Sequence, residues 1–135
     1  MATIRKDILT HAAAADAWAA IRDIGALHTR LVPGFVTDTK LEGNVRVVTF
    51  GNGSVVREPI VTMDDEIRRL VWTAQGGLAT HYNSSVQVFE EDPVQTRIVW
   101  ISDFLPDAIA DRMDAAMSAG AAAMQRKLDQ VSTGN

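Results

Sequence analysis

The sequence predicts an α+β domain in which a curved, seven-stranded antiparallel sheet wraps around one long C-terminal helix. Three patterns lead to this fold class. Short β-branched segments separated by turn residues fill most of residues 35–104, a long amphipathic stretch follows Pro106, and a short helical pattern comes after the first strand. Strands joined by short turns indicate an antiparallel meander, because parallel strands need long crossover connections.

The N-terminal part is expected to hold one strand and two short helices. Residues 2–10 alternate weakly between apolar and polar side chains, which predicts the first strand. Residues 12–24 carry apolar side chains at intervals of three and four, which predicts a helix that ends at Gly25. A second helical turn is expected over residues 26–30, before the bend at residues 33–34.

Six further strands are expected over residues 35–41, 45–50, 55–63, 69–74, 80–89 and 96–104. The segments between them are rich in Gly, Asn, Asp and Glu, several of which favour turns. Pro59 lies inside the third of these strands and cannot donate a hydrogen bond to a neighbouring strand. That strand is therefore expected at an edge of the sheet or with a β-bulge.

The long C-terminal helix is expected to begin at Pro106, since proline is tolerated in the first turn of a helix. One stripe of this helix is apolar or small at three- and four-residue spacing: Ile109, Met113, Met117, Gly120, Met124 and Leu128. No linker or repeat is visible, so we expect a single domain over residues 1–131, followed by a frayed tail at residues 132–135.

Composition excludes several classes of function. The net charge of −4 and the lack of long basic runs argue against a nucleic-acid partner. Because the chain has no cysteine, disulfides, thiolate metal sites and cysteine nucleophiles are excluded. Neither a signal-peptide pattern nor an apolar stretch of membrane-spanning length is visible, so we expect a cytoplasmic protein without membrane insertion.

The helix stripe leaves open whether the space beneath it is packed or hollow. Small Ala116 and Gly120 beside flexible Met117 would either allow close contact between helix and sheet or leave room for a ligand. Both interpretations are compatible with the stripe alone.

Alternation along the last two strands bears on this question. In residues 80–89 the half-apolar face carries the hydroxyls of Tyr82 and Ser84, and in residues 96–104 one face carries Trp100 and Ser102. Buried hydroxyls need hydrogen-bond partners, and a few polar groups in an apolar interior are typical of small-molecule sites. We therefore expect a cavity with these side chains in its wall.

Several short motifs carry a family resemblance. They are Trp-Ala-Ala-Ile at 18–21, Val-Arg-Glu-Pro-Ile at 56–60, the glycine pair at 76–77, His-Tyr-Asn-Ser-Ser-Val at 81–86 and Arg-Lys-Leu at 126–128. With these motifs the whole chain resembles the START-like, polyketide-cyclase and Bet v 1-related proteins, known as SRPBCC domains. The resemblance implies a helix-grip fold with an internal ligand cavity.

The middle of the chain is similar to the plant abscisic acid receptors. That similarity implies a gate loop at Gly51, Asn52, Gly53 and Ser54, a second loop at residues 76–80, and cavity positions at Tyr82, Ser84, Ala116, Gly120 and Met124. The lysine that holds the hormone carboxylate in those receptors falls at Thr37, and an interior glutamate falls at Ser102. A buried carboxylate would then lack its partner, so a neutral ligand is expected instead.

Two residues are the candidates for catalysis. Glu58 shares the face of Val56, Ile60 and Thr62, where burial would raise its pKa. A structural glutamate, hydrogen-bonded or paired with Arg57 or Arg69, is nevertheless the favoured interpretation. His28 precedes the bend at residues 33–34 and could lie at a pocket mouth. No metal site is expected, since the acidic run 64–66 has the character of a turn.

We therefore expect a protein that binds a hydrophobic, mostly neutral small molecule between sheet and helix, without a cofactor, as a monomer or homodimer. A polyketide cyclase- or dehydrase-like enzyme using the same cavity is the alternative, and a packed domain without ligand is a third. The expected ligand-binding residues are Trp72, Tyr82, Ser84, Trp100, Ser102, Met113, Ala116, Met117, Gly120 and Met124.

Overall fold

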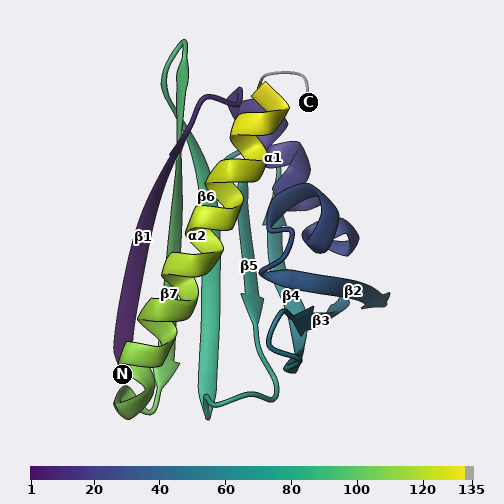
Figure 1. Cartoon of the computed structure of the whole chain (residues 1–135), viewed down its shortest axis with the longest axis vertical. Helices are drawn as coiled ribbons and strands as arrows, with labels where there is room; N and C mark the ends of the chain where they lie inside the picture. The colour runs from purple at the N-terminus through teal and green to yellow at the C-terminus, as the bar shows by residue number, and fades with distance from the viewer. Residues whose placement is uncertain (133–135) are drawn as a thin grey trace.

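The computed structural model of the chain describes residues 1–132 (Figure 1). The strands are β1 (Ala2–Thr10), β2 (Val36–Glu42), β3 (Val45–Phe50), β4 (Val55–Asp64), β5 (Arg69–Thr73), β6 (His81–Asp92) and β7 (Gln95–Leu105). The helices are α1 (Ala14–Arg22), the short turns η1 (Ile24–Ala26), η2 (Leu27–Leu31) and η3 (Asp107–Ile109), and the long α2 (Ala110–Ser132).

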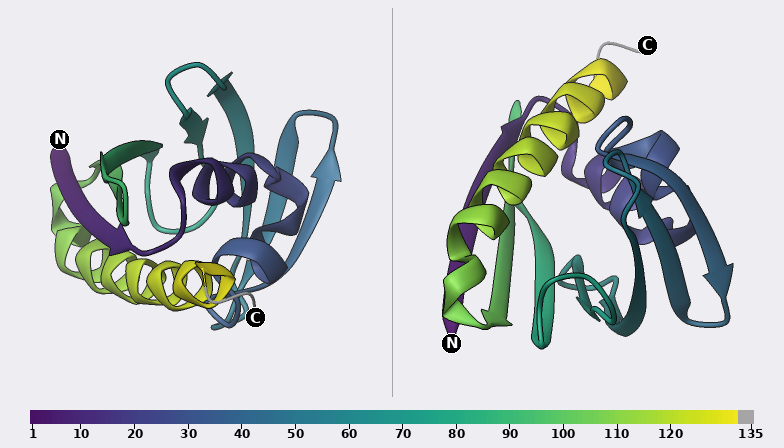
Figure 2. Two further views of the ribbon diagram at one scale, coloured as in Figure 1. Left: turned by 90° about the horizontal axis from the view of Figure 1, so that it is seen from above. Right: turned by 60° about the horizontal axis from the view of Figure 1, so that its bottom comes forward.

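The seven strands form one antiparallel sheet in the order β1-β7-β6-β5-β4-β3-β2. The sheet curves around α2, which lies diagonally across its concave face (Figure 2). The short helices α1, η1 and η2 follow β1, as expected from the alternation and helical patterns of the sequence. The predicted fold class is confirmed.

Pro59 was expected to mark either an edge strand or a β-bulge, and the structure shows the bulge. β4 lies between β3 and β5, so the prediction of an edge strand is wrong. The β-bulge is present, because the register between β4 and β5 shifts between Ile60 and Thr62. Pro59 itself is opposite Val45 on β3. The bulge also explains why Thr62 is exposed although simple alternation places it on the face of Glu58.

The C-terminal helix begins later than predicted. Pro106 follows a cis peptide bond and precedes the turn η3, and the regular α-helix starts at Ala110. The buried residues of α2 begin only at Met117, so the first two turns contribute little to the core. Of the tail predicted at residues 132–135, Ser132 is the last residue of α2 and the others lie outside the described residues.

The hydrophobic core lies between the sheet and the helices α1 and α2. Its large, fully buried side chains come from α1, the strands β5 and β7, and the C-terminal half of α2: Ile21, Leu70, Ile98, Phe104 and Leu128. Burying each such side chain stabilises the fold by roughly 1.5–3 kcal/mol. These side chains fix the sheet against α1 and the C-terminal half of α2.

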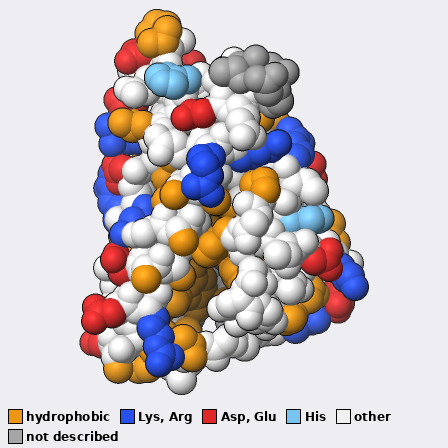
Figure 3. All heavy atoms as spheres, in the orientation of Figure 1, with side chains coloured by type: hydrophobic (Ala, Val, Ile, Leu, Met, Phe, Trp, Pro, Cys, Tyr) orange, Lys and Arg blue, Asp and Glu red, His pale blue; other side chains and the backbone are white. Residues whose placement is uncertain are grey.

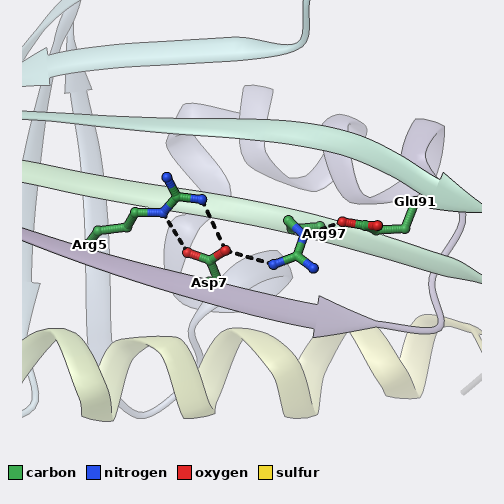
Figure 4. A network of polar contacts seen from close by, with 4 residues as sticks. All are labelled: Arg5, Asp7, Glu91 and Arg97. Atoms are coloured by element: carbon green, nitrogen blue, oxygen red, sulfur yellow. Dashed lines mark hydrogen bonds and ion pairs between the residues drawn. The ribbon is translucent and has the colours of Figure 1, made fainter.

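The outer face of the sheet carries a charged network across β1, β7 and β6 (Figure 4). The two carboxylate oxygens of Asp7 accept hydrogen bonds from Arg5 Nε and Arg97 Nη1, each at 2.7 Å. Arg97 also pairs with Glu91. The hydrogen bonds from Arg5 and then Arg97 lower the pKa of Asp7 from 3.8 to about 2.

Candidate ligand cavity between the sheet and helix α2

A cavity of about 430 Å³ lies between the inner face of the sheet and the N-terminal half of α2. Figure 3 shows a hollow on this side of the molecule with hydrophobic side chains in its walls. The volume falls in the range of roughly 300–1,000 Å³ that is usual for small-molecule sites. The two charged residues in its wall are Arg46 and Glu58.

The mouth of the cavity is formed by the start of α2 and two turns of the sheet. Met113 and Ala116 line it from the helix, and Ala116 is exposed. Leu78, in the loop between β5 and β6, also lines it and is 55 % exposed. Exposed apolar side chains around an apolar opening are typical of a site that receives a hydrophobic molecule.

The residues predicted as a gate loop form a tight turn between β3 and β4. Gly51, Asn52 and Ser54 line the cavity, whereas Gly53 does not. The turn is held by the bonds Gly53 N–H to Phe50 O at 2.9 Å and Phe50 N–H to Ser54 O at 2.8 Å. Gly51 N–H also donates to Phe35 O at 2.9 Å, which ties the turn to the segment before β2.

Gly51 is required by this close approach. A Cβ atom at this position would lie 2.6 Å from the carbonyl oxygen of Gly34, closer than real Cβ contacts. Any larger residue would push the turn away from the segment before β2 and break the bond to Phe35.

Seven of the ten predicted ligand-binding residues line the cavity: Trp72, Tyr82, Trp100, Met113, Ala116, Met117 and Met124. The other three, Ser84, Ser102 and Gly120, are buried but are not part of its wall. The alternation of β6 and β7 did place the two serines on the inner face, since both are fully buried.

The two serines take part in a closed chain of hydrogen bonds beneath the cavity. Ser84 Oγ lies 2.8 Å from Ser102 Oγ, accepts from Trp100 Nε1 at 2.8 Å and donates to Ile101 O at 3.2 Å. Ser102 Oγ lies 3.0 Å from the hydroxyl of Tyr82. The internal partners satisfy the buried hydroxyls, so these serines position the rings of Trp100 and Tyr82.

At Gly120 the helix α2 packs closely against two aromatic rings, and no open space lies beneath it. A Cβ atom here would lie 3.0 Å from both Trp100 Cη2 and Phe35 Cε2. The interpretation that a small residue allows close packing therefore holds at Gly120. Room for a ligand lies instead beside Met117 and Met124, whose flexible side chains line the cavity.

Glu58 is buried and points to the interior, as its alternation indicates, but its partner is Arg46. Arg46 Nε donates to Glu58 Oε1 at 3.0 Å and Arg46 Nη2 lies 2.8 Å from the same oxygen. The prediction that Glu58 pairs with Arg57 or Arg69 is therefore wrong. Arg57 instead pairs with Glu42 on the surface. Burial raises the pKa of Glu58 above its usual value, although the adjacent guanidinium opposes this shift.

Trp72 completes this polar part of the wall. The guanidinium of Arg46 lies over its ring, with Cζ 5.2 Å from the ring centroid, in a cation–π arrangement. The indole Nε1 of Trp72 is buried and has no hydrogen-bond partner among the described residues. It is the one such side-chain nitrogen or oxygen atom found in residues 1–132.

The remaining titratable candidates have structural partners. Tyr82 is held by Ser102, and burial raises the pKa of its phenol, so it stays protonated near neutral pH. His28 does not line the cavity; its Nδ1 lies 3.1 Å from Thr39 Oγ1 on β2. No group of three or more His, Cys, Asp or Glu side chains that could hold a metal ion occurs within the described part of the chain.

Comparison with known proteins decides the family. The family described as polyketide cyclase / dehydrase and lipid transport matches residues 1–133, nearly the whole chain. The chain belongs to this family. Together with the solved structures below, this confirms the resemblance to SRPBCC and START-like proteins. No curated protein matches the chain.

Solved structures of this START-like fold superpose closely at low sequence identity. The protein XoxI from Bacillus cereus has a TM-score of 0.85 at 20% identity, with 95% of this chain and 96% of that chain covered. A START superfamily protein from Mycobacterium smegmatis has a TM-score of 0.80 at 12% identity, with 96% of this chain and 98% of that chain covered. The Zhui aromatase/cyclase from Streptomyces sp. R1128 has a TM-score of 0.77 at 14% identity, with 98% of this chain and 93% of that chain covered. These likenesses establish the fold shared with the family.

In residues 1–132, no helix has the length and apolar character needed to cross a bilayer.

Proposed function

We propose that this START-like protein binds a mostly apolar, uncharged small molecule in the cavity between the sheet and α2. The observation that carries the proposal is the make-up of the cavity wall. Its walls are largely apolar, and its two charged side chains, Arg46 and Glu58, already neutralise each other. An ionised ligand would have to be dehydrated without gaining a free counter-charge, which is unfavourable.

The first experiment is mass spectrometry of the purified protein under native and then denaturing conditions. A bound apolar compound released in near-stoichiometric amount supports the proposal and identifies its chemical class.

The second experiment blocks the mouth of the cavity. Ala116 lines the mouth and is exposed, so Ala116→Trp places an indole in the opening without disturbing the core. Ala115 is also exposed on α2 but is not part of the cavity wall, so Ala115→Trp is the matched control. With 2-ethylnaphthalene as the probe in equilibrium dialysis, the first variant loses binding and the second retains it. Equal binding by both variants would place the probe outside the cavity.

A cyclase- or dehydrase-like enzyme is the second candidate, because two titratable side chains, Glu58 and Tyr82, line the same cavity. Both are already engaged by Arg46 and Ser102, which favours binding over proton transfer. Tyr82→Phe separates the two functions. It leaves the binding of 2-ethylnaphthalene intact in either case, and removes turnover of a poly-β-ketone substrate only if the protein is an enzyme that uses the Tyr82 hydroxyl.

A further inference from the structure

The turn between β3 and β4 contains a dipeptide that is chemically reactive. Asn52 is followed by Gly53, and it is the one asparagine of the sequence that precedes a glycine. Both residues are exposed, and Gly53 adopts a positive φ of 91°. The side-chain amide of an asparagine lies beside the backbone nitrogen of the next residue. Because glycine has no Cβ, nothing on its own side chain hinders an attack of this nitrogen on the amide carbon.

The hydrogen bonds of the turn act on the two reacting groups in opposite directions. The backbone N–H of Ser54 donates to Asn52 Oδ1 at 2.9 Å. A donor at this oxygen stabilises the negative charge that develops there when a nucleophile adds to the amide carbon. The N–H of Gly53 donates to Phe50 O at 2.9 Å, and this bond has to open before the nitrogen attacks. Since the turn is exposed, a local opening is enough to release it.

We propose that Asn52 is a site of spontaneous deamidation, with water as the co-reactant. The Gly53 nitrogen loses its proton and forms a bond to Asn52 Cγ. The bond from Cγ to Nδ2 then breaks, and ammonia leaves with that proton, so that a succinimide ring remains. Water opens the ring at one of its two carbonyl carbons. Opening at Cγ gives an aspartate, whereas opening at the backbone carbonyl carbon gives an isoaspartate, whose main chain runs through Cγ.

Deamidation at this position alters the wall of the cavity. Asn52 and Gly51 both line it, so either product brings a carboxylate to the edge of an apolar space. The isoaspartate also adds a methylene group to the main chain of the turn, which displaces Gly51 from its hydrogen bond with Phe35. The modified protein therefore binds an apolar ligand more weakly. The modification itself is independent of the proposed function, and only this effect on affinity rests on it.

Asn44 provides a matched comparison within the same protein. It lies in the turn between β2 and β3 and is exposed like Asn52, but the next residue is Val45. The β-branched side chain of valine crowds the backbone nitrogen beside it and hinders the attack. Asn52 is therefore converted, while Asn44 persists.

Incubation of the purified protein at physiological temperature and mildly alkaline pH, followed by digestion with trypsin, tests the proposal. Cleavage after lysine and arginine puts Asn52 in the peptide 47–57 and Asn44 in the peptide 41–46. Conversion of an amide to a carboxyl group raises the mass of a peptide by about 1 Da. The peptide 47–57 gains this mass with time and becomes a substrate for an isoaspartate methyltransferase, while 41–46 stays unchanged. An unmodified 47–57 peptide, or equal conversion of both peptides, overturns the proposal.

The effect on the cavity is measured separately, by equilibrium dialysis with 2-ethylnaphthalene. Asn52→Gln is the control, because glutamine would have to close a larger ring and reacts more slowly. Each protein is compared with its own fresh sample. The wild type loses binding in proportion to the fraction converted, whereas Asn52→Gln keeps its starting affinity. Conversion without loss of binding overturns the effect on the cavity. If the fresh wild type does not bind the probe, the proposed function is overturned, and the peptide masses still decide whether Asn52 is modified.

Discussion

Arg46 and Glu58 are directly opposite each other on β3 and β4, and their side chains form an ion pair buried in the wall of the cavity. The two residues are each six positions from Asn52, the centre of the hairpin turn. The register of this hairpin therefore places the two side chains next to each other. The ion pair in turn stabilises the register, because a slip of one strand by one residue would put the two charged side chains on opposite faces of the sheet.

Removal of one partner of this pair is expected to destabilise the fold strongly. Glu58→Gln leaves the guanidinium of Arg46 buried without a counter-charge, at a loss of about 3–5 kcal/mol in the free energy of unfolding. The double variant Arg46→Met with Glu58→Leu restores most of that loss, since it removes both charges together. Urea denaturation measures all three proteins.

The control for this prediction lies on the same hairpin. Arg57 and Glu42 form an exposed pair, so Arg57→Gln changes stability by less than about 1 kcal/mol. A similar loss for Glu58→Gln and Arg57→Gln would contradict the structural role of the buried pair.

Ser84 is expected to act on stability and not on ligand affinity. Ser84→Ala removes the acceptor of Trp100 Nε1 and lowers the free energy of unfolding by about 1–3 kcal/mol. Because Ser84 is not part of the cavity wall, the dissociation constant for 2-ethylnaphthalene stays unchanged. Ser85→Ala, on the opposite face of β6, changes stability by less than about 0.5 kcal/mol. A large loss of affinity in Ser84→Ala would show that the serine contacts the ligand.

Gly120 is expected to tolerate no bulky side chain. Gly120→Leu forces the rings of Trp100 and Phe35 away from α2, and overpacking of this kind costs about 1–3 kcal/mol. Ala119→Leu, exposed on the same helix, is nearly neutral by comparison. Thermal denaturation of both variants checks the prediction, and an increase in Tm for Gly120→Leu would mean that open space lies beneath the helix at this point.

The Asp7 network should give the protein a pH-dependent contribution to stability. The pKa of Asp7 is lowered in the folded state from 3.8 to about 2, so its contribution is present above pH 3.8 and is lost as the pH falls through 2. Asp7→Asn therefore has a lower Tm than the wild type at pH 6, and the two curves converge near pH 2. High salt reduces the difference, since these side chains are partly exposed. A difference that persists unchanged at pH 2 would contradict this role.

The fold could be predicted because its signals are local. Alternation, turn residues and the helical stripe each act over a few residues, and they located every strand of the sheet. Pro59 was harder, because its missing donor is compatible with an edge strand or a bulge, and only the neighbours of β4 decide between them.

The site could be predicted in part, because alternation reports which face a side chain occupies but not what it contacts. Alternation placed Tyr82 and Trp100 in the cavity wall. It could not show that the hydroxyl of Ser84 is hydrogen-bonded to Trp100 inside the protein. Arg46 was missed, although counting outward from Asn52 along the hairpin would have placed it opposite Glu58. The unpaired donor of Trp72 has no sequence signal, since it depends on the rotation of one ring.

The anchored turn at Gly51 has a consequence for the rates of ligand exchange. Swinging this turn outward would break the bond from Gly51 N–H to Phe35 O, so such an opening is slower than the motion of an unattached loop. The side chains of Met113 and Leu78 at the mouth change rotamer within picoseconds to nanoseconds where they are exposed. A ligand small enough to pass these side chains would exchange rapidly, whereas a larger one would have a long residence time that is limited by the turn.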